Sequence, residues 1–485
     1  MKPQMNADER RHYLSVREVV EAVNGKLVKG RGDDRFAGIA IDSRAVCDDD
    51  LFIAIVGRRL DGHVFVPEAL ARGAAGALVT RLEFADCIDR DVAVIFADDT
   101  TKALQNLAKW HRRRAMSRCP IIAVTGSNGK TTTKDLTWSI LSTKYETVRS
   151  EGSKNNHIGL PLTLLRLDQN TEAAVVELGT SAFGEIGDLV SICSPDIGCI
   201  TNIGPAHLEF FGNIANVAQA KAELLEGMRD GAPVVLNADD EWFEWLRGRA
   251  KGPVVTFGVY RPADFMAEDV RVENGSVTFR LIANPLGSRR YVRMPFAGAH
   301  NVYNALAAAA IASQVGIGTS EIKEGLAKAT LPAMRYEIST ISGVTVINDA
   351  YNANPVSTMS ALSSFCEMSI SGKRIFVCGD MLELGDYGRQ AHRQVGQFIR
   401  SQPIDYVIAL GSLSPEVVKA AFGDDLRGER WACCGSVEEV VSVLKEVAAP
   451  GDAVLIKGSR ANGMERIVDG LKGLALMPSL EDAKI

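Results

Sequence analysis

A short glycine-rich segment of the chain has the composition of a phosphate-binding loop. It runs Thr125, Gly126, Ser127, Asn128, Gly129, Lys130 and Thr131. Glycine lets a backbone curl so that its N–H groups point at one polyphosphate, and the start of a following helix adds partial positive charge. Lys130 can reach the terminal phosphates, and the Thr131 hydroxyl can bind an accompanying magnesium ion. The segment predicts a site for ATP or GTP, and an ordinary glycine turn is the alternative.

Two further side chains in this part of the chain suit phosphate chemistry, and a third is ambiguous. Glu177 ends an apolar run, and a carboxylate there can hold magnesium directly or through water. His207 follows a Gly-Pro turn and could be a metal ligand or a proton carrier. Lys221 lies in a helical pattern, where a surface lysine is the ordinary interpretation. For Glu177 and His207 the alternatives are a solvated strand-end glutamate and a hydrogen-bonded turn residue.

These residues need a scaffold that brings the ends of several strands together. Four apolar runs are separated by helical spans, which is typical of a parallel sheet covered on both faces. The runs cover 121–124, 173–178, 197–202 and 232–237. The carboxyl ends of parallel strands meet at one edge of a sheet, where ligands bind. We therefore expect the glycine-rich loop, Glu177 and His207 to lie close together.

The whole pattern indicates an α/β protein of three domains, and 485 residues are long enough for that number. Residues 1–117 alternate short strands, such as 51–57 and 77–80, with helices. Residues 118–330 hold the phosphate loop and its parallel sheet, and the Asn274-Gly275 pair predicts a hairpin in a small antiparallel flank. Residues 331–485 return to alternating strands and helices, which predicts a second, Rossmann-like open sheet.

Composition excludes several functional classes. A net charge of −6 argues against a nucleic-acid partner, and no apolar run approaches the length of about eighteen residues that a membrane span needs. The basic cluster 112–114 is local, and we interpret it as a solvated linker face. Nine cysteines without metal-like spacing, and no visible secretory signal, predict a cytoplasmic protein with reduced thiols and no inserted segment.

Three polar clusters in the last third of the chain are ambiguous on local grounds. Each follows an apolar run, so each could recognise a polar ligand or be a plain turn. The clusters are 349–355, 379–385 and 457–460. The last of them contains a lysine and an arginine and could bind an anion; a solvated loop is the alternative.

Taken together, these segments resemble the Mur ligase family, the ATP-dependent amide-forming enzymes of peptidoglycan precursor synthesis, over nearly the whole chain. The resemblance implies that 125–131 is the family's phosphate loop and that Glu177 and His207 bind metal. It implies that Lys221 is the family lysine that becomes carbamylated near magnesium. Segment 298–305 is similar to the family's adenine-side segment, with Asn301 as the contact. Two C-terminal residues resemble those that close on the phosphates and ribose, namely Arg335 and Asp349.

Motifs within the family favour one kind of acceptor and donor. Segments 42–44 and 61–63 resemble the ligases that add the third peptide residue and the terminal dipeptide, and the Asp-Asn-Pro-Arg motif of the diaminopimelate-adding enzyme is absent. Segments 184–186, 351–355 and 379–385 are similar to ligases that join D-alanyl-D-alanine to UDP-N-acetylmuramoyl-tripeptide. The resemblance implies four substrate contacts, Ser43, Arg44, Asn352 and Asn354. His157 stands where those ligases usually have glutamate, which leaves its part in substrate binding open.

The implied mechanism starts with transfer of the ATP γ-phosphate to the tripeptide carboxylate, followed by attack of the dipeptide amine on the acyl phosphate. ATP, two magnesium ions and carbamylated Lys221 are the implied cofactors, and a monomer is expected. Ligases that add single amino acids, and folylpolyglutamate synthase, would use the same chemistry. A nucleotide-dependent switch or binding protein is the alternative from another class.

Overall fold

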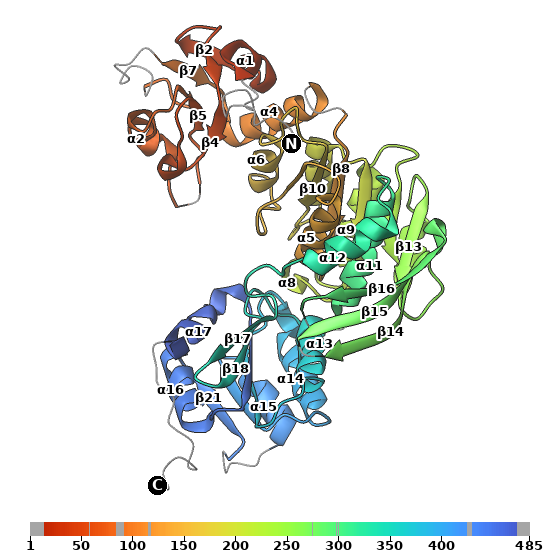
Figure 1. The fold of residues 1–485 in the computed structure, drawn as a ribbon. Coiled ribbons are helices and arrows are strands. Elements are labelled where there is room, and N and C mark those ends of the chain that lie inside the picture. Colours follow the sequence, from red (N-terminus) through yellow and green to blue (C-terminus); the bar gives the residue numbers. More distant parts are fainter. Residues whose placement is uncertain are drawn as a thin grey trace.

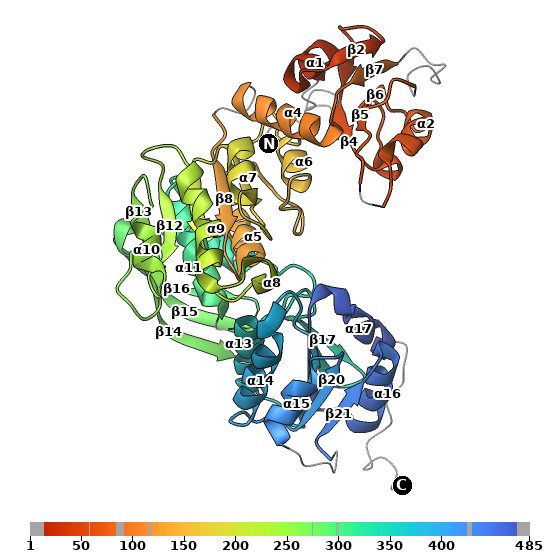
Figure 2. The same cartoon turned by 180° about the vertical axis from the view of Figure 1, so that it is seen from behind.

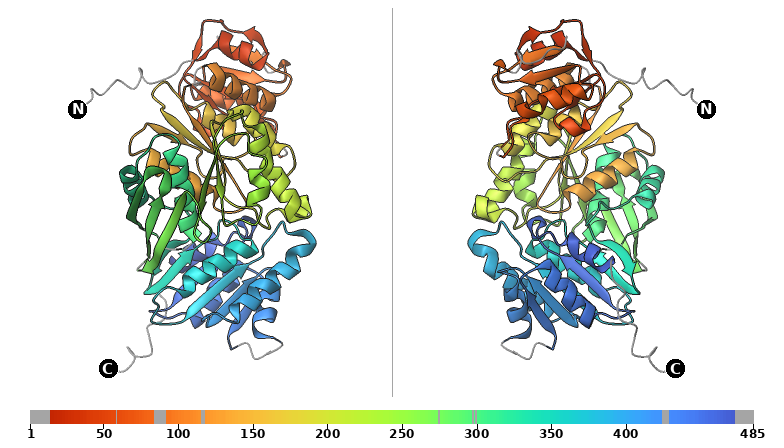
Figure 3. Two further views of the ribbon diagram at one scale, coloured as in Figure 1. Left: turned by 90° about the vertical axis from the view of Figure 1, so that its right-hand side faces the viewer. Right: turned by 90° about the vertical axis from the view of Figure 1, so that its left-hand side faces the viewer.

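The computed structural model describes residues 14–57, 59–83, 92–114, 118–273, 275–296, 298, 300–423 and 429–472. Three lobes of helices and strands follow one another in a row, in the order of the sequence (Figure 1). The view from behind and the two side views show the same succession (Figures 2 and 3). The lobes are centred on sheets of five, nine and six strands. The predicted α/β fold class is confirmed.

The first lobe is built on a five-stranded sheet with the order β2-β7-β6-β5-β4. Its strands are β2 (Lys26–Lys29), β4 (Gly38–Ala40), β5 (Asp50–Ile53), β6 (Gly76–Val79) and β7 (Ala93–Phe96), and β1 (Leu14–Ser15) pairs with β3 (Arg35–Phe36) beside it. Its helices are α1 (Val16–Val23), α2 (Val66–Ala71) and α4 (Thr100–Arg114). The strand predicted over 51–57 ends at Ile53, because Val56 bridges back to Asp61 in a turn.

Helix α4 fastens the first lobe to the second through a buried arginine. Arg112 is 5% exposed, and its guanidinium donates to the carbonyls of Cys119 and Cys193 and to the Asp196 carboxylate at 2.7 Å. The interpretation of 112–114 as a solvated linker face was therefore wrong at its first residue. Arg112 lies on the inner side of α4, where the rigid guanidinium satisfies carbonyls of the neighbouring lobe that would otherwise be buried without donors.

The central lobe contains the predicted parallel sheet and its antiparallel flank. The order is β16-β15-β14-β13-β12-β11-β8-β10-β9, with neighbours parallel from β9 to β14 and antiparallel from β14 to β16. The strands are β8 (Ile121–Thr125), β9 (Thr147–Arg149), β10 (Ala173–Glu177), β11 (Ile197–Ile200), β12 (Val234–Asn237), β13 (Val254–Gly258), β14 (Phe265–Glu273), β15 (Ser276–Ala283) and β16 (Ser288–Met294). The predicted hairpin joins β14 to β15; Asn274 in its turn lies outside the described residues.

Helices cover both faces of the central sheet, which is why its strands read as continuous apolar runs. One core packs β8, β10 and β11 against α5, α11 and α12, and the other packs the opposite face against α6, α7 and α9. The helices of this lobe are α5 (Lys130–Leu141), α6 (Gly159–Leu164), α7 (Glu185–Cys193), α8 (Leu208–Phe211), α9 (Ile214–Gly227), α10 (Phe243–Arg247), α11 (His300–Ser313) and α12 (Thr319–Lys328). Figure 1 shows α11 and α12 beside the flank formed by β13 to β16.

The third lobe is the predicted second open sheet, in the order β17-β18-β22-β19-β20-β21. Its neighbouring strands are parallel except for β17, which pairs antiparallel with β18. The strands are β17 (Glu337–Ile341), β18 (Val344–Asn348), β19 (Arg374–Gly379), β20 (Tyr406–Leu410), β21 (Trp431–Cys434) and β22 (Ala453–Lys457), and the helices are α13 (Pro355–Cys366), α14 (Gly388–Ile399), α15 (Pro415–Phe422), α16 (Val437–Val447) and α17 (Glu465–Lys472). Within the described ranges of the chain, no helix is long and apolar enough to cross a membrane.

Candidate active site

The order of three central strands brings the predicted site residues to one edge. Strand β8 lies between β10 and β11, and all three are parallel. The phosphate loop follows β8, Glu177 is the last residue of β10, and His207 lies in the segment after β11. The expected proximity follows from this register: Glu177, His207 and Lys130 line one cavity.

The loop has the backbone of a curled phosphate cradle. Gly126 and Gly129 have φ angles of +147° and +79°, which side-chain-bearing residues rarely adopt. A Cβ atom at Gly126 would lie 1.9 Å from Thr201 Oγ1, so the loop also needs glycine for close packing. The Lys130 ammonium donates to the carbonyls of Gly126 and Ser127 at 2.9 and 3.3 Å, folded over its own loop. Burial lowers the pKa of Lys130; the Glu177 carboxylate opposes this shift, and the charge of Arg335 adds to it.

Glu177 is a buried carboxylate with one oxygen in need of a partner. The residue is 1% exposed, and its Oε1 accepts a hydrogen bond from Asn155 Nδ2 at 2.8 Å. No donor in the described part of the chain reaches Oε2, which is buried. A buried carboxylate oxygen without a donor is costly unless a cation or water satisfies it. The donor set of Glu177 and the nearby Thr131 hydroxyl fits a hard divalent ion such as magnesium.

Asn155 is a site residue that the sequence did not reveal. It belongs to the 155–159 segment, which attracted notice only for His157. An adjacent pair of asparagines before a helix is a weak signal, since such residues usually form turns. Here the two asparagines have different partners. Asn155 donates a hydrogen bond to the Glu177 carboxylate, whereas Asn156 Oδ1 accepts from the amides of Ile158 and Gly159 at the start of α6.

Lys221 is a buried lysine on α9, not the surface lysine that its helical pattern indicates. It is 2% exposed. Burial lowers the pKa of its ammonium group well below the ordinary value, and the charge of Lys130 acts in the same direction. The interaction with Lys130 places it near the phosphate loop, although it does not line the cavity beside that loop. The helical pattern could not reveal this burial, because it does not show which elements pack over the Lys221 side of α9.

His207 meets a carboxylate from the third lobe. Its Nδ1 atom lies 2.7 Å from Glu383 Oε2, and the side chains are 26% and 48% exposed. The imidazole lowers the pKa of the Glu383 carboxyl. Among described atoms, no hydrogen bond is aligned on Nδ1, so the 2.7 Å approach is a close contact of the two side chains without the geometry of a hydrogen bond. Glu383 lies in the 379–385 cluster that the sequence left ambiguous.

Two cavities border the phosphate loop. The larger, about 790 Å³, lies between the central and third lobes and reaches the start of α6. Its lining includes Ser127, Lys130, Thr131, Asn155, His157, Glu177, His207, Arg335, Asn352, Asn354 and Glu383. The smaller, about 470 Å³, lies on the other side of the loop and is lined by Asp239, Trp242, His300, Asn301, Tyr303, Asn304, Tyr336 and Asp349, among others. Asn128, Gly129 and Arg335 line both, so the loop separates them.

Two side chains of the third lobe reach the phosphate loop directly. Arg335 Nη2 lies 3.4 Å from Thr131 Oγ1, and its guanidinium stacks 4.0 Å above the Tyr351 ring. Asn354, which caps α13, donates from Nδ2 to Asn128 Oδ1 at 2.7 Å. The buried Arg335 Nε has no acceptor in the described structure. An arginine held by its ring contact and carrying a spare N–H is suited to bind an oxyanion.

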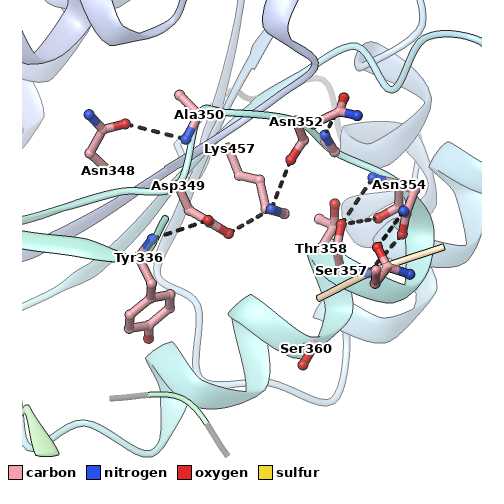
Figure 4. A network of polar contacts seen from close by, with 12 residues as sticks. Tyr336, Asn348, Asp349, Ala350, Asn352, Asn354, Ser357, Thr358, Ser360 and Lys457 are labelled. Carbon is pink, nitrogen blue, oxygen red and sulfur yellow. Dashed lines mark hydrogen bonds and ion pairs between the residues drawn. The ribbon is translucent and has the colours of Figure 1, made fainter. Parts of the chain in front are cut away.

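Asp349 and Lys457 form a buried ion pair that organises the neighbouring turn (Figure 4). The Lys457 ammonium donates to Asp349 Oδ2 at 2.6 Å and to the Asn352 carbonyl at 3.1 Å, and the Tyr336 amide donates to Asp349 Oδ1. Lys457 is therefore not the solvated loop residue that was one of the alternatives, and it lines both cavities. Its charge is matched by Asp349, and together they fix the turn that presents Asn352 to the larger cavity.

The adenine-side prediction falls on the smaller cavity. Asn301 is 1% exposed, and its Oδ1 accepts from Asn304 Nδ2 at 3.1 Å. Asn304 Oδ1 in turn accepts from the Thr133 hydroxyl on α5. Burial lowers the pKa of neighbouring His300 to about 4, so its imidazole is neutral near pH 7. Asn304 and His300 lie in the same predicted adenine-side segment, 298–305, in which Asn301 alone was singled out as the contact.

Two predicted substrate residues stay apart from both cavities. Ser43 is buried and donates to Glu68 Oε2 at 2.9 Å, whereas Arg44 is exposed and paired with Asp42. Both are on the first lobe and line neither cavity. His63 of the 61–63 segment is buried, and its Nε2 accepts from the Thr80 amide. His157 does line the larger cavity, and its carbonyl accepts from Gln105 on α4.

Comparisons with known proteins match all three lobes. Family models described as Mur ligase family, catalytic domain, Mur ligase middle domain, and Mur ligase, glutamate ligase domain match residues 35–112, 124–312 and 334–460. A Bacillus subtilis (strain 168) protein named UDP-N-acetylmuramoyl-tripeptide--D-alanyl-D-alanine ligase is 36% identical, over 94% of this chain and 98% of its own. The Escherichia coli (strain K12) protein of the same name is 34% identical over 95% and 98%.

Solved structures agree with these sequence matches. Crystal structure I of MurF from Acinetobacter baumannii superposes with a TM-score of 0.86 at 30% identity, covering 96% of this chain and 100% of that one. The MurF ligase from Thermotoga maritima in complex with ADP gives a TM-score of 0.77 at 25% identity, covering 90% and 97%. The similarity therefore extends over the three lobes together and includes a nucleotide-bound relative.

Proposed function

Because this chain belongs to the Mur ligase family, we propose that the larger cavity is where it joins D-alanyl-D-alanine to UDP-N-acetylmuramoyl-tripeptide at the expense of ATP. The chain is an ATP-dependent ligase of peptidoglycan synthesis. The observation that carries the assignment of the site is the convergence of three groups on that cavity: the phosphate loop, the half-satisfied carboxylate of Glu177, and Arg335 from the third lobe.

The reaction proceeds through an activated carboxyl group. The carboxylate of the tripeptide attacks the γ-phosphorus of ATP, the bond to the β-phosphate oxygen breaks, and ADP leaves. The free amine of the dipeptide then attacks the acyl carbon, loses a proton, and inorganic phosphate departs with the bonding electrons. The first step brings two anions together and the second expels an anionic phosphate, so fixed positive charge is the main requirement of the site.

The two cavities divide the substrates between them. Adenosine occupies the smaller cavity beside Asn301, with Asp349 at the ribose, and the phosphates cross the loop from Thr125 to Thr131. The γ-phosphate then faces the larger cavity, where the acceptor carboxylate arrives. The Lys130 ammonium exchanges its two carbonyl partners for phosphate oxygens, and the spare Nε–H of Arg335 binds the transferring phosphoryl group.

Magnesium fits the donor set on the loop side of the larger cavity. Two magnesium ions would be held by Glu177, the Thr131 hydroxyl and His207. The buried Glu177 Oε2 is the clearest ligand among them, because it accepts no hydrogen bond from the described residues. When bound, the metal neutralises charge on the phosphate oxygens. Asn155 fixes the Glu177 carboxylate so that Oε2 is the oxygen left available. Each of these roles is our proposal for the residues that the lining brings together.

Lys221 is suited to become a carbamate. A neutral amine adds carbon dioxide with loss of a proton, and burial together with the charge of Lys130 favours the neutral form of Lys221. The product is a carboxylate, which attracts the Lys130 ammonium, whereas a protonated Lys221 would repel it. In this proposal the carbamate supplies a further acidic ligand on the α9 side of the phosphate loop.

The three lobes divide recognition of the substrates. Residues 1–117 bind the UDP-sugar-peptide, 118–330 bind ATP, and 331–485 close on both. Ser43 and Arg44 line neither cavity, so they contact the UDP-linked end of the substrate while its peptide extends toward the larger cavity. Asn352 and Asn354 meet the peptide or dipeptide from the third lobe. The molecule acts as a monomer in this scheme.

Phosphate release tests the function. The protein is incubated with ATP, magnesium, UDP-N-acetylmuramoyl-tripeptide and D-alanyl-D-alanine. Phosphate release is followed, and the mass of the product is measured by mass spectrometry. We expect phosphate release that depends on the dipeptide, together with a pentapeptide product. Phosphate release without a covalent product would instead indicate a nucleotide-dependent switch or binding protein. A product that has gained a single amino acid would indicate another ligase. Lys130→Ala abolishes turnover if the loop acts as described. Residue three of the peptide is tested with diaminopimelate- and lysine-containing substrates.

A further inference from the structure

The boundary between the central and third lobes has a dedicated contact beside the larger cavity. His207 precedes α8, and Glu383 precedes the short helix η5 (Gly385–Tyr387) of the third lobe. Both have left-handed backbones, with φ of +55° and +62°. Such conformations are uncommon for residues with side chains and are kept where the surrounding structure imposes them. Here two of them face each other across the lobe boundary.

Backbone and apolar contacts hold the two segments together. The Glu209 amide donates to the Glu383 carbonyl at 3.0 Å. A Cβ atom on Gly385, whose φ is +54°, would lie 3.2 Å from Glu209 Cα, so the chains approach closely. Tyr387 packs against a small core of the central lobe, formed by Leu208, Phe211, Val217 and Ala220. The side-chain pair is therefore attached to a fixed interface rather than to two loose loops.

This interface controls what the imidazole can reach. The Glu383 carboxylate takes the Nδ1 side of the His207 ring at 2.7 Å, and both residues line the larger cavity. A histidine held by a carboxylate at one nitrogen has its orientation set and its other nitrogen directed elsewhere. The carboxylate comes from the third lobe, so the ring orientation depends on where that lobe sits.

We propose that Glu383 is a positioning residue: it holds the His207 imidazole in its working orientation only when the third lobe is docked on α8. The proposal rests on the function assigned to the larger cavity. It makes lobe docking and arrangement of the site one event, because the same segment supplies the apolar anchor, the backbone acceptor and the carboxylate. Closing the lobe then completes the site around the transferring phosphate.

An imidazole NMR spectrum of the ligand-free protein tests the contact directly. The chain has seven histidines, so histidine-specific nitrogen labelling gives few signals, and a His207→Gln variant identifies the one from His207. Glu383→Ala is expected to shift that signal. The matched control is Glu438→Ala, which removes an exposed carboxylate paired with Arg466 on the same lobe. A His207 signal that is unchanged in Glu383→Ala overturns the proposal.

Kinetics then separate positioning from general stability. Carboxylates that orient a functional histidine typically change activity by about 10–100-fold when removed. We expect Glu383→Ala and Glu383→Gln to lower kcat by that factor while KM for ATP and Tm stay close to wild type, because Glu383 is half exposed and remote from the adenosine cavity. Wild-type kcat in Glu383→Ala refutes the role. A wild-type protein without dipeptide-dependent phosphate release refutes the proposed function instead, and the NMR result still decides the contact.

Discussion

The glycine at the start of α5 offers a quantitative test of the phosphate loop. Gly129 has a φ of +79°, and an added Cβ would lie 2.3 Å from Asn304 Oδ1. Asn304 is 7% exposed, accepts from Thr133 Oγ1 at 3.2 Å and donates to Asn301 Oδ1 at 3.1 Å. Gly129→Ala therefore strains the backbone and displaces a side chain that orders the adenosine cavity.

A matched control separates these two effects. Gly231 has a φ of +78°, lies in the same lobe, and has no atom within 4 Å of an added Cβ. A left-handed alanine costs about 1–2 kcal/mol, of which about 0.4–1 kcal/mol is offset by the stiffer unfolded chain. Gly231→Ala should therefore lose about 1 kcal/mol. Gly129→Ala should lose a further ~1–3 kcal/mol, since two buried hydrogen bonds at roughly 0.5–1.5 kcal/mol each are disturbed.

Denaturant unfolding of the central lobe measures the difference. Trp138, Trp242 and Trp245 are three of the five tryptophans and all lie in this lobe, so fluorescence follows it preferentially. Calorimetry with ADP measures the second consequence: we expect at least tenfold weaker binding for Gly129→Ala, about 1.4 kcal/mol, and no change for Gly231→Ala. If the two variants unfold at the same denaturant concentration and bind ADP equally, the steric reasoning is refuted.

Three other substitutions test separate parts of the structure. Asn155→Ala removes the donor that lies 2.8 Å from the buried Glu177 carboxylate, and should lower the free energy of unfolding in the absence of metal by about 1.5–3 kcal/mol. We also expect turnover to require a higher magnesium concentration. An unaltered magnesium titration contradicts the role of Glu177. Arg112→Met leaves the carbonyls of Cys119 and Cys193 without their donor, whereas Asp196 keeps the Ile121 amide and Arg229; the loss should be about 1–3 kcal/mol for each carbonyl in a urea titration, whereas a surface arginine would cost little. Lys221→Met should raise Tm while abolishing turnover. Burial lowers the pKa of Lys221 in the folded state, so the unfolded chain binds more protons at pH values between that lowered pKa and 10.5. The stability of the wild-type protein therefore rises with pH through this window. The Tm advantage of Lys221→Met should accordingly shrink as the pH approaches 10.5, and a constant or growing advantage speaks against a buried neutral lysine.

Local chemistry in the sequence determined the sheet architecture and the phosphate loop. Continuous apolar runs separated by helices predicted the parallel strands, and the Asn274-Gly275 pair predicted the antiparallel flank. Because strand ends share an edge, the sequence also placed Glu177 and His207 beside the loop. These predictions succeeded because hydrophobic periodicity and glycine geometry act over a few neighbouring residues.

Only the tertiary structure decided which polar groups are buried and whom they meet. Arg112 and Lys221 lie in helical patterns that look solvent-facing, yet neighbouring elements cover both. The contacts of His207 with Glu383 and of Asn354 with Asn128 join residues far apart in the chain. Burial and pairing depend on how lobes dock, which is a property of the whole assembly of helices and sheets; a local pattern specifies a residue's own conformation but not the surface that packs against it.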